Sequence, residues 1–117
     1  MGLTSKRFVL LMVGWLAAGL TYASQSDSTE MLAFAKSKVC LGCHQVDARR
    51  VGPSFTLIAQ RHADQPGAQD YLASAIRQGG RGRWGAVPMP AQPQVSEADA
   101  KRLAQWILTL KPANPAK

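Results

Sequence analysis

The sequence has few of the side chains from which metal and redox sites are usually built. Its 117 residues include only two cysteines and two histidines, namely Cys40, Cys43, His44 and His62. A tetrahedral zinc site needs four protein ligands, and two of these four are adjacent in the chain and hard to aim at one ion. A thioredoxin-like dithiol is disfavoured because the glycine- and proline-rich flanks lack a βαβ pattern. A plain disulfide would leave the adjacent histidine unexplained.

The chain also lacks an apolar run long enough to cross a bilayer. The longest run, residues 8–20, falls short of the roughly 20 residues that a membrane-spanning helix needs. It follows two basic residues and precedes small residues that end at Ala23. This arrangement predicts a cleaved signal peptide, residues 1–23, and a mature domain, residues 24–117, with no stable membrane insertion. A retained membrane anchor is the alternative, and no cysteine follows the cleavage point to carry a lipid.

Acidic residues are half as frequent as basic ones. The chain has 14 Lys and Arg against 7 Asp and Glu, and loss of the leader would remove two of the basic residues. Such a protein can attract acidic partners or anionic surfaces, although excess basic residues are most often only solvated surface. Nucleic acid is not expected as a partner, because the basic residues are dispersed and no nucleic-acid-binding motif is present.

The most informative stretch is residues 40–44, which have the sequence Cys-Leu-Gly-Cys-His. This spacing is typical of the attachment site of a c-type haem. On one turn of helix, Cys40 and Cys43 can reach the two vinyl groups at a porphyrin edge, and His44 can present a ring nitrogen to the iron. Both cysteines would become thioethers, which agrees with the lack of further cysteines in an exported chain. We therefore predict one covalent haem c, with its iron, at the centre of a small domain.

The second axial ligand is predicted in the proline-rich segment 81–94. Met89 stands there between two prolines, which hold it in an extended segment suited to a thioether that must stay on the iron. It follows the histidine of the attachment motif by 45 residues, enough chain to reach the opposite haem face. The other methionine of the mature domain, Met31, lies in an amphipathic pattern that favours core packing. His62 is an alternative ligand, but a surface position beside a loop is expected for it.

An all-α fold of about four helices is expected around this haem. The first expected helix opens at a capping box made of Asp27 and Glu30 and runs to about Lys38. The others are residues 56–61, residues 69–78, and residues 97–110 after a cap at Ser96. The first should pack beside the haem edge and the last helix, with an inward face made of Met31, Phe34, Ala35 and Val39. Gly79 and Gly80 should end the third helix by permitting a left-handed cap. No internal repeat or second domain is visible.

Gly52 and Pro53 predict a rigid bend close to the histidine face of the haem. The carbonyl of Pro53 is free to accept a hydrogen bond, and a ligand histidine generally donates its second ring N–H to such a group. An ordinary turn is the alternative interpretation.

With these residues in view, the chain resembles the small bacterial class I cytochromes c of the cytochrome c-551 type. The matching motifs are, in order, residues 40–44, residues 51–53, residues 79–80, residues 84–90, and residues 95–96 before the helix that contains residues 103–108. The resemblance implies thioether bonds from Cys40 and Cys43 and axial ligation by His44 and Met89. It also implies that the Pro53 carbonyl orients the ligand histidine.

Further roles follow from the same resemblance. Trp84 would donate its indole N–H to a haem propionate, with simple packing as the alternative. Arg77 and Arg83 are candidates to balance propionate charge, with solvent exposure as the ordinary state of each. The sequence departs from the family at two positions. Gln92 stands where members often carry an asparagine whose amide contacts the methionine sulfur, and Ala91 replaces a frequent third proline.

His and Met ligation keeps the iron six-coordinate in both oxidation states and leaves no place for a substrate. We therefore expect a periplasmic one-electron carrier, not an enzyme, that docks transiently on respiratory redox partners through electrostatic contacts at the haem edge. One alternative is the haem subunit of a larger oxidoreductase. Another is a haem-based gas sensor or weak peroxidase in which Met89 leaves the iron.

Overall fold

The computed structural model describes residues 22–110, so the predicted leader lies outside the described residues except for its last two. The elements, in chain order, are α1 (Tyr22–Ser37), the short 3-10 helix η1 (Cys40–Gly42), α2 (Phe55–His62), α3 (Ala68–Gln78) and α4 (Glu97–Thr109). Within this part of the chain the β-structure is a single isolated bridge between Gly80 and Met89. The predicted all-α fold is thus confirmed. None of the described helices is long and apolar enough to cross a membrane.

Side-chain caps fix where two of the helices begin. The Ser54 hydroxyl accepts a hydrogen bond from the backbone N–H of Leu57 at 3.1 Å, at the start of α2. The Ser96 hydroxyl accepts one from the N–H of Asp99, also at 3.1 Å, at the start of α4. Each bond satisfies one of the backbone donors that a helix start leaves free. The predicted starts of these helices are therefore correct to within one residue.

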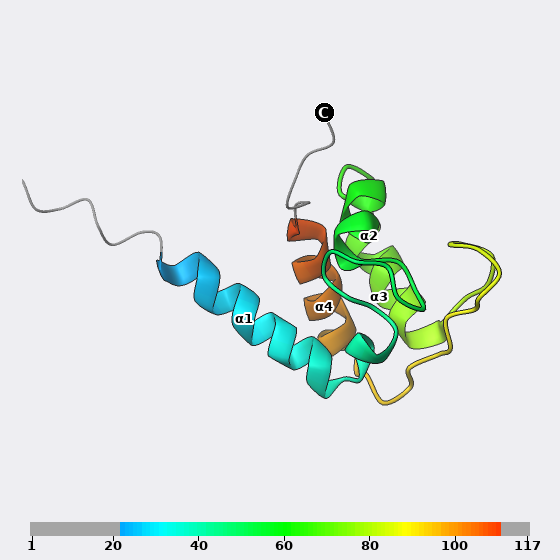
Figure 1. The fold of residues 1–117 in the computed structure, drawn as a ribbon, viewed down its shortest axis with the longest axis horizontal. Helices are drawn as coiled ribbons and strands as arrows, with labels where there is room; N and C mark the ends of the chain where they lie inside the picture. Colours follow the sequence, from blue (N-terminus) through cyan, green and yellow to red (C-terminus); the bar gives the residue numbers. More distant parts are fainter. Residues whose placement is uncertain (1–21, 111–117) are drawn as a thin grey trace, which may run out of the picture.

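A small core joins α2, α3 and α4, with α3 and α2 both packed on α4 (Figure 1). Its most completely buried large side chains are Leu103 of α4 and Val95 of the preceding loop. Phe55 of α2 meets Trp106 of α4 edge to face, with ring centroids 5.4 Å apart. Full burial of a side chain such as Leu103 stabilises the fold by about 1.5–3 kcal/mol. The long loop between α3 and α4 extends on the side of the bundle away from α1 (Figure 1).

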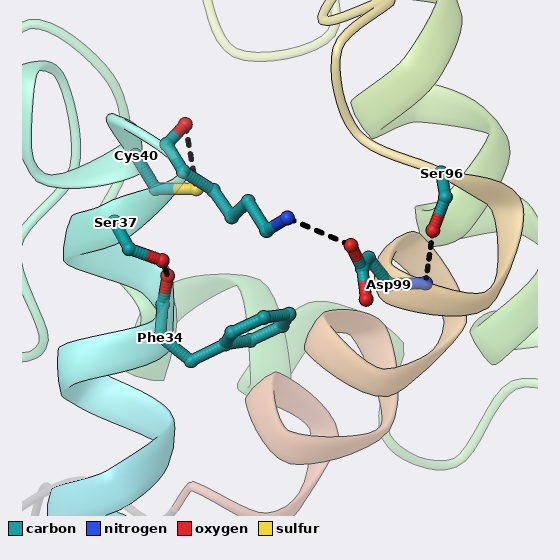
Figure 2. Close-up of polar contacts among 6 residues, drawn as sticks. Phe34, Ser37, Cys40, Ser96 and Asp99 are labelled. Atoms are coloured by element: carbon teal, nitrogen blue, oxygen red, sulfur yellow. Dashed lines mark hydrogen bonds and ion pairs between the residues drawn. The ribbon is translucent and has the colours of Figure 1, made fainter.

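Two ion pairs and a shared aromatic ring hold α1 and Lys38, the residue that follows it, against α4. Lys38 Nζ lies 2.7 Å from the Asp99 carboxylate (Figure 2), and the Arg102 guanidinium lies 2.6 Å from Glu30. Both cations also lie over the ring of Phe34, at 5.2 and 4.7 Å from its centroid. The predicted contact between the first and last helices is confirmed. This contact places the η1 turn, which follows α1 and begins the motif of residues 40–44, beside the core.

Two expectations for α1 are wrong. The helix runs through Asp27 without a capping box, because it begins at Tyr22 and no proline or glycine interrupts the residues that follow. Val39 does not face the core, because its backbone adopts a left-handed conformation (φ 66°) and its side chain is 71% exposed. The helix ends before this residue, and the turn carries the side chain off the inward face, where Met31 and Ala35 remain buried.

Candidate haem-binding site

A cavity of about 400 Å³ is enclosed by α2, α3, α4, the turn at η1 and the loops that follow η1 and α3. Its walls are mostly apolar, and α2, α3 and α4 contribute Phe55, Ile58, Leu72, Ile76, Leu103 and Ile107. Seven of the predicted haem-site residues line it, namely Cys40, Cys43, His44, Pro53, Arg83, Trp84 and Met89. A cavity of this size and lining suits a large flat apolar ligand. The sequence places these residues far apart, and the fold gathers them around one space.

The ring of His44 is held from three sides. Its Nδ1 lies 2.7 Å from the carbonyl oxygen of Pro53. A carbonyl can only accept, so Nδ1 carries the proton and Nε2 keeps a lone pair free to bind a metal. The ring stacks on Phe55 at 5.4 Å between centroids. Gly52 lies so close that a Cβ at that position would come within 2.7 Å of the imidazole. The bend predicted at Gly52 and Pro53 therefore also fixes the position of the His44 ring.

The η1 turn brings both cysteines to the cavity. The N–H groups of Cys43 and His44 both donate to the carbonyl of Cys40, at 3.2 and 3.0 Å. Cys40 and Cys43 are not joined by a disulfide. Burial raises the pKa of the Cys40 thiol, although a hydrogen bond to the backbone and the charge of Lys38 act in the opposite direction. Cys43 is exposed. The described residues contain no cluster of three or more His, Cys, Asp or Glu side chains that could hold a metal ion by themselves.

Met89 is fastened to the end of α3 by its backbone. Its N–H donates to the carbonyl of Gly80 at 2.9 Å, and its carbonyl accepts from the N–H of Gly80 at 3.0 Å. The neighbouring Gly79 has a φ of 70°, and a Cβ there would overlap the carbonyl oxygen of Met89. The left-handed cap predicted for this position is wrong in detail. Gly79 has a ψ of −163°, because the chain straightens there to pair with the methionine segment.

Gln92 stabilises the same loop. Its backbone N–H donates to the carbonyls of Ile76 and Arg77 at 3.2 Å, and its side-chain amide donates to the Pro90 carbonyl at 3.1 Å. Its amide oxygen accepts from Gln94 at 2.7 Å. These bonds tie the segment after Met89 back to α3. The glutamine thus has a structural place in the loop, on the cavity wall.

One end of the cavity is cationic. Arg83 and Arg49 both line it, and the Arg49 guanidinium donates to the carbonyl of Trp84 at 3.1 Å. Arg61 lies over the Trp84 ring at 4.4 Å and donates to the carbonyl of Arg83 at 2.7 Å. Carboxylates of a bound ligand would find favourable charge here. Sequence reasoning missed Arg49 and Arg61, whose proximity to Trp84 arises only in the folded chain.

Arg77 lies elsewhere. It lines a shallow groove between α3 and α4, together with Asp70 and Lys101, and does not line the cavity. The structure therefore gives no support to the expectation that Arg77 balances a propionate. Arg83, the second arginine proposed for this role, does line the cavity.

His62 is not the surface histidine that was expected. It is 7% exposed and lines the cavity from the last turn of α2. Its Nδ1 lies 3.0 Å from the amide oxygen of Gln65, and its ring packs on Tyr71 and Trp84. The prediction failed because it weighed the polarity of histidine and the nearby loop. The aromatic ring in fact closes a gap between α2, α3 and the segment that contains Trp84.

The site combines apolar walls, two adjacent thiols, a fixed histidine with one free nitrogen, a methionine on another segment and a cationic end. This donor set fits a haem with two thioether bonds, two axial ligands and two carboxylates. Fold and site together define a small all-α haem protein of the c type.

Comparison with known proteins supports this class. Residues 33–111 match the family model of Cytochrome c. The chain is similar to cytochrome c-552 of Hydrogenobacter thermophilus, with 45% identity over 91% of this chain and 99% of the relative. It is 52% identical to cytochrome c-552 of Nitrosomonas europaea over 86% of this chain and 100% of the relative. The crystal structure of the wild-type Nitrosomonas europaea protein superposes with a TM-score of 0.67 at 50% identity, over 68% of this chain and 99% of that one.

The chain therefore belongs to the cytochrome c family. It is a small class I monohaem cytochrome c, and membership of this family implies one covalently attached haem c with its iron.

Proposed function

We propose that this protein is a periplasmic one-electron carrier between respiratory redox partners. In it, Cys40 and Cys43 form the thioether bonds, and His44 and Met89 are the axial ligands. The observation that carries the proposal is that a preset histidine and a backbone-fastened methionine line the same cavity. Two such ligands fill the coordination sphere and leave no open position for a substrate. The names of the relatives, cytochromes c-551 and c-552, agree with this role.

The haem, when bound, supplies the one-electron couple. The protein supplies ligands that need not move when the charge changes. His44 is fixed by Pro53, Phe55 and Gly52, and the Met89 segment is fixed by its paired hydrogen bonds to Gly80. The apolar walls keep water away, and this exclusion together with a thioether ligand favours a raised reduction potential.

Contact with a partner would be made at the mouth of the cavity. Three exposed valines line it, namely Val39, Val51 and Val87, which are 71%, 52% and 62% exposed. Arg49 and Arg83 also line the cavity. A small apolar patch with cationic neighbours suits a weak, rapidly released complex with an acidic partner. Trp84 and Arg83 would hold the propionates at this end.

The proposal is tested on the purified mature protein. We expect an intact mass equal to residues 24–117 plus one haem, and an alkaline pyridine spectrum of a haem with two thioether bonds. The reduced protein should not bind carbon monoxide at neutral pH. Carbon monoxide binding by the unaltered protein would contradict the carrier role and support a sensor or peroxidase. Purification as a stoichiometric complex with a catalytic chain would instead indicate an oxidoreductase subunit.

The ligand assignment is tested by Met89→Ala. The variant should keep its covalent haem, bind carbon monoxide when reduced and show a lower reduction potential. Met31→Leu is the matched control, because Met31 is buried between α1 and the core and does not line the cavity. An unchanged spectrum and potential in Met89→Ala would show that Met89 is not the ligand.

A further inference from the structure

The basic residues of the chain differ in whether they have an acidic partner. Lys38, Lys101 and Arg102 each form an ion pair with a carboxylate of α1, α3 or α4. Within the described part of the chain, five exposed arginines form none, although Asp47 and Asp64 stand near them in the sequence. They belong to the loop after η1, the last turn of α2 and the loop after α3, and are Arg49, Arg50, Arg61, Arg81 and Arg83. Their charge is therefore available to an anionic partner.

Arg61 is fixed by two contacts with the segment around Trp84. Its guanidinium lies over the Trp84 ring at 4.4 Å from the centroid, and its Nη1 donates to the Arg83 carbonyl at 2.7 Å. Arg50, in contrast, donates to the Leu41 carbonyl at 3.4 Å, which is longer than an ordinary hydrogen bond. A side chain that is already fixed loses little conformational entropy when a partner binds. Arg61 is therefore preorganised for recognition.

The contacts of Arg61 leave one edge of its guanidinium without a partner. The stack on Trp84 uses the face of the group, and the bond to the Arg83 carbonyl uses Nη1. Within residues 22–110, Nε and Nη2 have no hydrogen-bond acceptor. Their N–H groups point in parallel from the same edge and match the two oxygens of a carboxylate. Because Arg61 is exposed, this edge is available to a carboxylate of another molecule.

Arg61 also differs from its neighbours in lying outside the haem cavity. Arg49 and Arg83 line the cavity, whereas Arg61 does not. It covers the ring of Trp84, which does line the cavity. A carboxylate bound at Arg61 would thus be held next to the cavity without displacing a carboxylate of the haem.

We propose that Arg61 recognises a carboxylate of an acidic redox partner through its paired Nε and Nη2 donors. The inference rests on the proposed electron-carrier function and deepens it, because it assigns partner specificity to one residue. A surface ion pair ordinarily contributes little, since two mobile side chains must be ordered, but fixed bidentate geometry is an exception. Positive charge by itself attracts any anionic surface. Arg61 selects the surfaces that present a carboxylate in the matching orientation.

The test uses the reduced mature holoprotein and a synthetic peptide of six glutamates as the carboxylate probe. Binding is followed by NMR at low salt, through the backbone amide resonances of α2 and of the loop after α3. We expect saturable binding that is about two- to tenfold weaker in Arg61→Lys, the range expected for the loss of a hydrogen bond. Lysine keeps the positive charge but lacks the parallel donors. Unchanged affinity in Arg61→Lys would overturn the proposal.

Arg77→Lys is the matched control. Arg77 is exposed and has no ion pair within the described residues, but it lies in the groove between α3 and α4. This variant should bind the peptide as the unaltered protein does, and an equal loss in both variants would overturn the proposal. Inorganic phosphate is titrated in parallel. Phosphate that bound as tightly as the peptide would show a general anion site and would also overturn it.

A second reagent separates recognition from support of the Trp84 ring. Oxidation of the reduced protein by hexacyanoferrate(III), an anion without carboxylates, is measured by stopped flow in the unaltered protein and in Arg61→Lys. The loss of peptide affinity should exceed any change in this rate. An equal change in both would indicate a disturbed cavity and would overturn the recognition role. Failure of the proposed function is seen separately, as a missing covalent haem or as carbon monoxide binding by the unaltered protein.

Discussion

The Nδ1 atom of His44 lies 2.7 Å from the carbonyl oxygen of Pro53, and the side of the same ring meets the bare Cα of the preceding residue, Gly52. One dipeptide thus sets both the tautomer and the orientation of the proposed iron ligand. A hydrogen bond to the second nitrogen of a ligand histidine also makes that histidine a stronger donor. The bend that holds the ring is therefore part of the site.

This relationship predicts the effect of Gly52→Ala. The new Cβ would lie 2.7 Å from Cε1 of His44, so the ring or the bend must shift, at a cost of about 1–3 kcal/mol in the free energy of unfolding. The NMR resonances of His44, the proposed axial ligand, should shift as well. Gly42→Ala is the control, because a Cβ at Gly42 meets nothing within 4 Å. Equal losses of the free energy of unfolding in Gly52→Ala and Gly42→Ala, measured with denaturant, would contradict a role of Gly52 in holding the His44 ring.

A second glycine predicts how firmly the methionine segment is held. Gly79 has a φ of 70°, and a Cβ there would also overlap the Met89 carbonyl. Gly79→Ala should therefore weaken the proposed bond of Met89 to iron and lower the free energy of unfolding by more than backbone strain alone. Gly67→Ala is matched to it, since Gly67 has a φ of 74° but open space around the missing Cβ. Carbon monoxide binding and thermal unfolding of both variants give the comparison. Similar behaviour would argue against a role for the contact.

Val39 predicts a stabilising substitution. It is a β-branched residue in the left-handed region, which costs an L-residue roughly 1–2 kcal/mol. Val39→Gly removes this strain and loses part of the gain to the greater freedom of glycine in the unfolded chain, of about 0.5–1 kcal/mol. The net effect should be a small rise in Tm. Val51→Gly is the control, because Val51 is also an exposed valine that lines the cavity but has no positive φ. The Tm of Val51→Gly should not rise.

The ion pair between Lys38, directly after α1, and Asp99 of α4 predicts a dependence of stability on pH. The hydrogen bond from Lys38 holds the pKa of Asp99 below its usual range (Figure 2). A carboxyl whose pKa is lowered by folding stabilises the fold above its unfolded pKa, and this contribution disappears as the pH falls through the folded value. Asp99→Asn should therefore be less stable than the unaltered protein at pH 7, with a difference that vanishes in strong acid.

The matched control is Glu97→Gln. Glu97 also lies in the first turn of α4, but its partner Lys101 belongs to the same helix. Both substitutions remove a negative charge that the helix dipole favours, so the excess loss in Asp99→Asn measures the link between the two helices. Denaturant unfolding at pH 7 and at low pH gives both values. An equal loss in the two variants would show that the link contributes nothing.

Local signals predicted the later helices well. The Ser96 cap and the glycines at 79 and 80 marked two of their boundaries in the sequence, and α3 and α4 each end within a residue of the predicted position. The Ser54 cap at the start of α2 was not recognised from the sequence. The attachment motif and the bend at Gly52 and Pro53 were found for the same reason, since each is a short stretch with its own chemistry. All of these features depend on neighbours in the chain.

The errors depend on partners that are distant in sequence. His62 is buried because Tyr71 and Trp84 cover it, and Arg49 joins the cavity because the loop brings it to Trp84. The residues next to His62 and Arg49 in the sequence do not predict either contact. The start of α1 was missed for another reason, because a capping pattern can also lie inside a helix when nothing stops the helix earlier.

The attachment motif and Met89 belong to different parts of the fold. The η1 turn follows α1, whereas Met89 is hydrogen-bonded through its backbone to Gly80, just after α3. A haem bonded at η1, as we propose, would stay on the chain even when every other contact is lost. During refolding, the tethered haem regains its axial ligands in a first-order process, because no free haem has to be bound from solution. Denatured protein should keep its colour and refold at a rate that does not change on dilution.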